Sequence, residues 1–308
     1  MARPRVIRAA AWVVVAAGVA APLVRRRARL KPPVVAVAAY AAPVALCVAV
    51  RRSRGRDVAT ALLHMWAYLA MYEMPNDDPD ALARRARIRY PVIVDRALGL
   101  GELPGVRLQR ALSRPGTTTR LEAVLVWAHW LWFFFPHGTV GYLLVFHRER
   151  FPRGAAHIYA VFDAGSLFYH AIPTAPPWYA ARRGEILSDP ELRRLMVEHG
   201  ETFWRERWGP LYSFLGGNPL AAMPSLHFAT SVMAALVLAE VGPVHGALGW
   251  AYTLTLGFAL VHLGEHYVAD LVAGAALTAA VRRAAGPAAP ALASASRAVA
   301  RLEARAHA

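Results

Sequence analysis

The sequence is short of cysteine, lysine and acidic residues. Cys47 is the only cysteine among 308 residues, so no disulfide can form within the chain. Lys31 is the only lysine, and nearly all of the positive charge is therefore arginine. The 20 Asp and Glu residues stand against 35 Lys and Arg, which gives a formal net charge of +15. This charge lies between apolar runs, as expected for basic flanks that contact anionic lipid, and nucleic-acid binding is not expected.

Hydrophobic residues are abundant. They make up 56% of the chain, and the mean hydropathy is +0.31, which is too apolar for an ordinary soluble protein of this length. Apolar runs near the ~20 residues that cross a bilayer core occur at about 9–24, 33–50, 58–74, 121–147, 155–172, 223–241, 246–262 and 266–283. The sequence therefore predicts an all-α, polytopic transmembrane helix bundle that resides in the cell membrane.

We expect three parts along the chain. Residues 1–56 form an N-terminal membrane hairpin, whose first run is a retained helix because arginines, not a small-residue cleavage site, follow it. Residues 57–285 form a six-helix catalytic membrane domain, with a kink near Pro136 and Gly138. Its hydrophilic segment 75–120 is expected to lie in the headgroup region and to roof the site. Residues 286–308 form a frayed amphipathic or disordered tail.

The basic loops predict an orientation in the membrane. With eight helices, the arginine-rich segments 51–56, 147–153 and 282–283 fall on one side, which should be cytoplasmic. The apolar runs that begin near His227 and His266 then open on the extracytoplasmic side. The basic segment 25–31 is the exception, because it falls on that side as well. The heavy use of Ala and Arg is typical of a GC-rich bacterial genome.

Two short motifs carry most of the functional signal. Ala222–His227 and His266–Asp270 each stand at the mouth of an apolar run. His266 and Asp270 are four residues apart, so on a helix they share a face and the carboxylate can hold one ring nitrogen of the imidazole. The other nitrogen remains available as a nucleophile or base, and His227 can supply a proton from a different helix. Two histidines and an aspartate at a membrane surface favour phosphoryl transfer on a lipid.

These motifs resemble those of a known family. Pro-Ser-Leu-His, followed by Gly-Glu-His-Tyr-x-x-Asp at 264–270, resembles the second and third motifs of the type 2 phosphatidic acid phosphatase superfamily. The His-Tyr-x-x-Asp form looks most like the branch that contains fungal inositol phosphorylceramide synthases and sphingomyelin synthases. Pro-Thr-Ala-Pro-Pro-Trp at 173–178 is similar to a segment upstream of the second motif in bacterial members of that branch. The resemblance covers roughly residues 57–285.

The resemblance implies a role for each motif residue. His266 is the nucleophile and forms a phosphohistidine, while Asp270 fixes its tautomer and stabilises the imidazolium. His227 protonates the leaving alcohol and then activates the incoming alcohol or water. Two other interpretations are polar caps on helix ends and a metal site on the same three residues. No further ligand is spaced to complete a metal site, and the family works without one, so no metal or cofactor is expected.

Phosphate oxygens require amide donors or cations. Ser225 and the backbone N–H groups that follow it are suited to a phosphate, although Ser225 can equally be a plain helix cap. Tyr267 lies inside the third motif, and we expect it to contact the substrate as well. The superfamily has an arginine six residues before the third-motif histidine, and here that position is Leu260.

Four arginines are candidates for the missing phosphate ligands. The superfamily's first motif, Lys-x6-Arg-Pro, has its spacing in Arg107 to Arg114, with Arg in place of Lys. Arginine can clamp phosphate oxygens bidentately as well as lysine or better. Arg182 and Arg183, just beyond Trp178, compete for the same role. The alternatives are a chance match in an arginine-rich chain and a basic flank at the membrane interface.

The function that these features favour is a lipid phosphotransferase, which moves a phospho-headgroup such as inositol phosphate to a lipid or glycan alcohol. The first alternative is hydrolysis of a polyprenyl phosphate, a polyprenyl diphosphate or phosphatidate. The two differ in whether an alcohol or water resolves the phosphohistidine. A second alternative is a non-catalytic membrane scaffold or transporter on the same fold. The expected partners are membrane lipids, with a phospholipid or polyprenyl phosphate as substrate.

Overall fold

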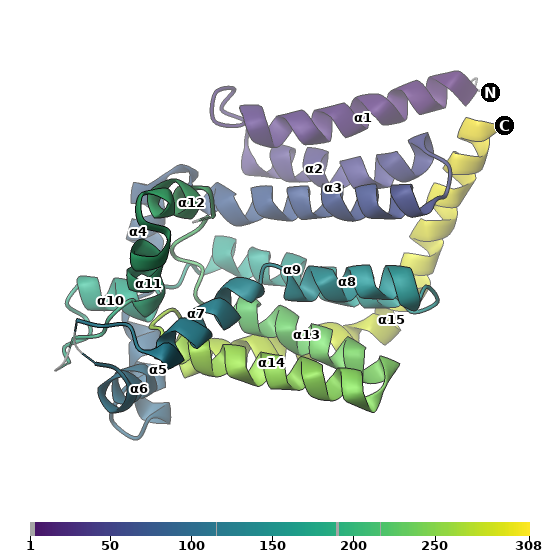
Figure 1. Ribbon diagram of the computed structural model, residues 1–308. Coiled ribbons are helices and arrows are strands. Elements are labelled where there is room, and N and C mark those ends of the chain that lie inside the picture. Colours follow the sequence, from purple (N-terminus) through teal and green to yellow (C-terminus); the bar gives the residue numbers. More distant parts are fainter. Residues whose placement is uncertain (1–3, 115, 189–190, 216) are drawn as a thin grey trace. The chain divides into compact units, whose positions relative to one another are not determined.

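The computed structural model describes residues 4–114, 116–188, 191–215 and 217–308. Every regular element in these residues is a helix, which confirms the all-α fold (Figure 1). The chain divides into two compact units, which are described separately. The first comprises the chain up to Asp77 together with Arg283–Ala308, and the second is Asp78–Arg282.

The first unit contains α1 (Pro4–Val24), α2 (Pro32–Ala49), α3 (Arg54–Glu73), a 3-10 turn (Met74–Asp77) and the C-terminal part of α15 (Val268–His307). α1, α2 and α3 pack against one another, and Ala306 of α15 joins the buried cluster of α1 and α2 residues. Arg25, in the basic segment that conflicts with the charge rule, is paired with Glu73 at 3.2 Å and Asp77 at 2.8 Å. These two acids neutralise part of the positive charge of that segment.

This division differs from the three parts predicted from the sequence. α3 was assigned to the catalytic domain, but it packs with the N-terminal hairpin because Ala67, Tyr68 and Ala70 are buried within the first unit. The tail was expected to be frayed or disordered. Instead, α15 continues as a helix to His307, and Glu303 accepts a hydrogen bond from the buried Arg56 at 2.7 Å.

The second unit begins with short helices and continues with longer apolar ones. In chain order they are α4 (Pro79–Arg85), α5 (Arg89–Leu98), α6 (Pro104–Leu112), α7 (Arg120–Leu131), α8 (Phe135–Phe146), α9 (Phe151–Ala171), α10 (Pro177–Arg182), α11 (Leu195–Trp204), a 3-10 turn (Arg205–Arg207), α12 (Trp208–Leu215), α13 (Leu226–Val241), α14 (Pro243–His262) and the first part of α15. α13 packs along α14 and also contacts α8 and α9, whereas α7 lies on α14.

The long apolar run at 121–147 is broken into two helices. α7 starts at a capping box, in which Thr119 and Glu122 exchange side-chain and backbone hydrogen bonds. It ends at Leu131, and α8 begins at Phe135 with Pro136 in its first turn, where a missing N–H costs nothing. The predicted kink is therefore a complete interruption just before Pro136.

Three of the described helices are long and apolar enough to cross a membrane, namely α1, α2 and α14. α13 is apolar but shorter, with 16 residues. These lengths are compatible with a membrane protein, since about 20 residues cross a bilayer core.

Candidate active site

His266 lies in the turn between α14 and α15. The backbone N–H groups of Glu265 and His266 both donate to the carbonyl of Leu260, at 3.1 and 3.0 Å. Gly264 permits this tight return because its φ is +76°, a conformation that disfavours residues with a side chain. Leu260 itself is fully buried. At the position where the superfamily has an arginine, this chain therefore has a core residue that holds the histidine backbone in place.

Asp270 lies in the first turn of α15 and fixes the His266 ring. Its Oδ2 atom is 3.1 Å from His266 Nδ1 and accepts a hydrogen bond from the Tyr267 backbone N–H at 2.9 Å. Asp270 is fully buried and His266 is 5% exposed. An ionised carboxylate only accepts hydrogen bonds, so His266 Nδ1 carries the proton in this contact. The lone pair of the ring is then on Nε2.

His227 comes from the first turn of α13. Its Nδ1 atom lies 3.2 Å from His266 Nε2, so the three predicted catalytic side chains form one chain of contacts. Two features bring α13 and α15 together here. The Ser225 N–H donates to the Asp270 carbonyl at 3.0 Å, and a Cβ at Gly274 would lie 2.7 Å from the Ser225 carbonyl. Only glycine fits this approach without displacement of the two helices.

Aromatic rings surround His227. Trp132, from the break between α7 and α8, has its ring centroid 4.2 Å from that of His227, and its indole N–H donates to Thr230 at 2.9 Å. His129 of α7 lies 5.0 Å away, centroid to centroid. The His227 ring is half-buried between these groups and His266.

The segment 173–178, singled out in the sequence, connects the two motifs. The Thr174 carbonyl accepts from the Ala222 N–H at 3.1 Å, at the start of the first motif. At the other end of the segment, the Trp178 N–H donates to the Gly264 carbonyl at 3.3 Å, beside the second motif. Ala175 is fully buried between these contacts. The segment thus ties the chain before α13 to the turn that carries His266.

Arg194 is paired with Glu265, the residue that precedes His266, although the two lie 71 residues apart in sequence. It forms a two-point ion pair with Glu265, at 2.8 and 3.0 Å, and its side chain is 14% exposed. The guanidinium lies 4.0 Å from the centroid of the Trp178 ring and donates to the Tyr212 hydroxyl at 2.7 Å. Burial acts to raise the pKa of the Glu265 carboxyl, but the Arg194 charge outweighs burial and holds that pKa below its usual range.

The four predicted phosphate-binding arginines make other contacts. Arg107 donates to the Gly99 carbonyl and to Glu102, and the Arg114 carbonyl accepts from Arg193. Arg182 lies over the Trp178 ring, at 5.2 Å, while Arg183 lies over Tyr179. None of these contacts involves His227, His266 or Asp270.

Ser225 and Tyr267 lie close in sequence to the candidate catalytic residues His227 and His266. Ser225 is fully buried, and its hydroxyl accepts from the Phe228 N–H at 3.3 Å, which is the contact of a helix cap. Tyr267 is 1% exposed and belongs to a buried hydrophobic cluster. Its hydroxyl has no hydrogen-bond partner among the described residues.

The hydrophilic segment 75–120 packs on the turn that carries His266. Val92 of α5, Leu103 and Val106 of α6 share one buried cluster with Tyr267 and Ala269. Asp95 of α5 is 1% exposed, and its carboxylate accepts from the Ala269 N–H at 3.0 Å, at the start of α15. Burial raises the pKa of Asp95 to about 6, and the neighbouring Asp270 carboxylate acts in the same direction. The segment that was expected to roof the site therefore contacts the start of α15 directly.

Sequence reasoning missed several residues around the three catalytic candidates: His129, Trp132, Glu265, Asp95 and Arg194. Glu265 lies inside the third motif that was quoted from the sequence. A buried acid beside a histidine predicts a cation nearby, so this residue carried a signal that could have been used. Arg194 itself is 71 residues away in sequence and has no motif spacing. Within the described ranges, no group of three or more His, Cys, Asp or Glu residues is arranged to hold a metal ion.

Comparison with known proteins gives one family. A model of the PAP2 superfamily matches residues 92–283, which is more than half of the chain and includes both motifs. No curated protein and no solved structure matches the chain.

Proposed function

The chain belongs to the PAP2 superfamily, and we propose that within it the protein is a membrane lipid phosphotransferase. It moves a phospho-headgroup, such as inositol phosphate, to a lipid or glycan alcohol through a phosphohistidine on His266. The observation that carries this proposal is the contact chain from His227 through His266 to Asp270, with links of 3.2 and 3.1 Å. Family membership supports the coarser statement, a phosphatase-type or phosphotransferase-type enzyme with lipid-phosphate substrates.

The first chemical step uses the free nitrogen of His266. Asp270 holds Nδ1–H, so the Nε2 lone pair attacks phosphorus and forms an N–P bond. The P–O bond to the leaving alcohol breaks, and for a phosphatidylinositol donor that alcohol is diacylglycerol. His227 enters this step as an imidazolium and donates its Nδ1 proton to the leaving oxygen, which leaves a neutral ring. Asp270 then stabilises the positive charge on the phosphorylated imidazole.

The second step reverses these roles. The acceptor hydroxyl attacks phosphorus and gives its proton to His227, and the N–P bond breaks to return the lone pair to His266. The product is a phosphodiester when the acceptor is an alcohol and a free phosphoryl headgroup when it is water. His227 is restored to its protonated form, so both histidines are ready for another turnover.

Substrate must separate the two rings before this chemistry occurs. A phosphorus atom has to lie within about 3–3.5 Å of His266 Nε2 for attack, but His227 Nδ1 is already 3.2 Å from that atom. Because His266 is held by Asp270, the His227 ring is the one that moves, past Trp132 and His129. The resting contact therefore shields the nucleophile until a phosphate displaces His227.

Arg194 is the cation that we assign to the phosphate oxygens. A guanidinium has five N–H donors, and three are used by Glu265 and Tyr212. The Glu265 partner compensates its charge, so the pair adds little net positive charge to the site. A phosphodiester donor carries one negative charge, whereas a monoester approaches two near neutral pH. The paired arginine thus supports a diester donor, and hence headgroup transfer.

Burial of the nucleophile also supports transfer. His266 is 5% exposed and Asp270 is fully buried, while Tyr267 and Ala269, which lie between them in sequence, share a buried cluster with residues of α5 and α6. Exclusion of water protects a phosphohistidine from hydrolysis. Hydrolysis remains the second candidate, since the half-buried His227 ring provides a path by which water can reach phosphorus. We further propose that the protein is a multi-pass bacterial membrane protein with this site on the extracytoplasmic face.

The test uses the purified full-length protein with phospholipid and polyprenyl phosphate donors, with and without an alcohol acceptor. Free phosphate and transferred headgroup are both followed. Acceptor-dependent headgroup transfer is expected, with its loss in His266→Ala and its retention in the control His157→Ala, whose contact is with the Arg153 carbonyl of its own helix. Phosphate release that does not depend on acceptor would make the protein a phosphatase. Absence of both products with every donor would contradict an enzyme and favour the scaffold.

A further inference from the structure

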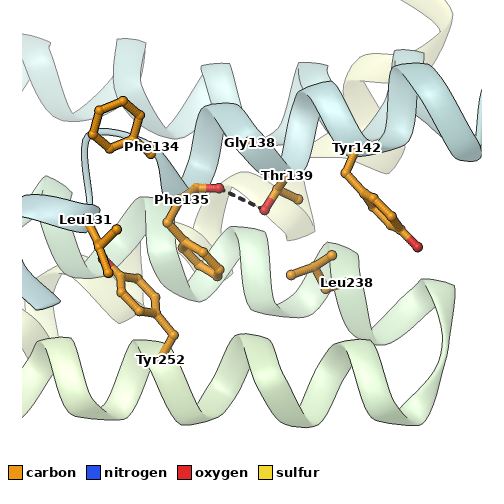
Figure 2. Close-up of a pocket in the computed structure, with 8 residues that line it drawn as sticks. All are labelled: Leu131, Phe134, Phe135, Gly138, Thr139, Tyr142, Leu238 and Tyr252. Atoms are coloured by element: carbon orange, nitrogen blue, oxygen red, sulfur yellow. Dashed lines mark hydrogen bonds between the residues drawn. The ribbon is translucent and has the colours of Figure 1, made fainter.

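An apolar groove lies along the second unit, between α8, α13 and α14. It has a volume of about 340 Å³, which falls in the range of small-molecule sites. Figure 2 shows Leu131, Phe134 and Phe135 at one end and Tyr142 at the other, with Leu238 and Tyr252 on the facing helices. Its described lining contains no charged side chain. The Thr139 hydroxyl in the wall is already bonded to the Phe135 carbonyl at 2.9 Å, so it offers little to a polar ligand.

One end of the groove adjoins the candidate active site. Leu131 and Phe134 flank the segment that carries Trp132, whose ring lies 4.2 Å from that of His227. Phe135 packs on Tyr252 with ring centroids 4.2 Å apart, so the same α7–α8 break forms both the His227 wall and the groove wall. A lipid with its phosphate at His227 therefore has its hydrocarbon chains beside this end of the groove.

The distance from His227 to Leu238 in the groove wall fits the hydrocarbon chains of one lipid leaflet. Leu238 is eleven residues after His227 on α13, and at 1.5 Å per residue this is about 16 Å along the helix. Half of a ~30 Å hydrocarbon core is about 15 Å. At the far end, the Tyr142 hydroxyl contacts His245 at 2.8 Å and so places a polar group where the apolar lining stops.

The groove is open towards the surroundings of the helices. Phe134 is 70% exposed and Leu131 is 51% exposed, so both present apolar surface outside the protein core. A Cβ added at Gly138 meets no atom within 4 Å, which means that this glycine leaves free space in the wall. α14, which forms the opposite wall, is apolar and long enough to cross a membrane. With α14 in a membrane, the open side of the groove faces the hydrocarbon of the bilayer.

We propose that this groove binds one hydrocarbon chain of the lipid substrate while its phosphate lies at His227 and His266. The inference rests on the proposed function, because it takes the substrate to be a lipid. The chain enters sideways from the bilayer between α8 and α14, and Tyr142 sets the depth that it reaches. Each methylene group buried in the groove strengthens binding, so the groove selects lipids by chain length.

The test fills the groove at Gly138 and uses Gly141 as the matched control. Both glycines lie on α8 with open space at the Cβ position, but only Gly138 lines the groove. Gly138→Phe and Gly141→Phe are placed in nanodiscs of dioleoyl phosphatidylcholine with phosphatidylinositol carrying a diazirine near the end of one acyl chain. Light-induced crosslinking to peptides of α8 and α13 is measured by mass spectrometry, and this readout needs no turnover. Crosslinked label is expected on wild type and on Gly141→Phe. In Gly138→Phe the amount of crosslinked label is expected to fall at least fivefold.

The second readout compares turnover of donors with long and short acyl chains. In Gly138→Phe the KM for a 16-carbon donor is expected to rise at least tenfold, while the value for a 6-carbon donor stays within twofold of wild type. Gly141→Phe should match wild type with both donors. Equal crosslinking in all three proteins, or loss of long-chain and short-chain turnover in equal proportion, would overturn the proposal. Crosslinking as expected without turnover of any donor would retain the groove as a lipid site and refute the proposed reaction instead.

Discussion

Removal of the Glu265 carboxylate is expected to destabilise the protein strongly, because it leaves the Arg194 charge buried without a partner. The pair is enclosed, with side-chain exposures of 14% for Arg194 and 9% for Glu265. Loss of one partner from a buried ion pair typically costs about 3–5 kcal/mol, whereas replacement of both by apolar groups is often close to neutral. Glu265→Leu should therefore be less stable than the double variant Arg194→Met with Glu265→Leu.

The magnitude can be followed through melting temperatures in one detergent. For a unit of 150–250 residues, 1 kcal/mol corresponds to about 2–4 °C, so Glu265→Leu is expected to melt roughly 6–20 °C below wild type. The double variant loses the pair and one hydrogen bond to Tyr212, which is worth about 1 kcal/mol. It is expected to recover at least half of the loss. The control Arg193→Met with Glu198→Leu removes a more exposed pair and should shift the melting temperature by only a few degrees.

The reasoning would be refuted if the stability losses of the two single variants simply added in the double variant. If Glu265→Leu and Arg194→Met each lower the melting temperature and the double variant lowers it by their total, the two charges do not depend on each other. The ion pair would then contribute no free energy of unfolding beyond that of two independent side chains. Arg194 would also lose its assignment as a fixed cation for the phosphate oxygens.

Three further outcomes are expected. Asp270→Asn should lower kcat by about 10³–10⁴-fold, because an amide can turn its N–H towards the ring and hold His266 in the wrong tautomer; a loss below tenfold in steady-state kinetics would contradict this. Asp95→Asn should flatten the pH dependence of stability. Because the pKa of Asp95 is raised to about 6, the stability that this carboxyl contributes is present at low pH and is lost as pH rises through 6, by up to roughly 3 kcal/mol. The melting temperature of the variant, relative to that of wild type, should therefore rise between pH 4 and pH 7. In the first turnover, before His227 is needed as a base, His227→Ala should release an alkyl alcohol far more slowly than wild type but a nitrophenol at nearly the wild-type rate, because nitrophenolate leaves without protonation. Equal losses of first-turnover rate with both donors would remove His227 as the acid.

The contact between His266 and Asp270 was accessible to sequence reasoning because it follows from local geometry. His266 and Asp270 are four residues apart at the start of α15, and that spacing alone brings the carboxylate to the ring. Pro136 likewise marked the break between α7 and α8, since proline cannot continue a helix through its interior. The motif with His227 marked the start of α13. In each case the determining interaction lies within about one helical turn.

The residues that were missed are placed by long-range packing. Arg194 reaches Glu265 across 71 residues, and Asp95 reaches Ala269 across 174. No periodicity or spacing in one sequence records such distances. The helical tail was missed for a related reason: its Ala, Pro and Ser composition resembles that of a disordered end, while its helix is stabilised by contacts with distant residues such as Arg56. Arg107 and Arg114 were chosen by motif spacing, and Arg182 and Arg183 by their position just beyond Trp178. Neither criterion determines where a flexible side chain finds its partner.

The most direct test of the account is detection of the covalent intermediate on His266. Wild-type protein is mixed with radiolabelled phosphatidylinositol without acceptor, quenched in alkali after milliseconds to seconds, and digested for mass spectrometry. A phosphoinositol adduct on the His266 peptide is expected, labile to acid, chased into product by an alcohol acceptor, and absent in His266→Ala. An adduct on another residue, or headgroup transfer by His266→Ala at the wild-type rate, would contradict the assignment of His266 as the nucleophile.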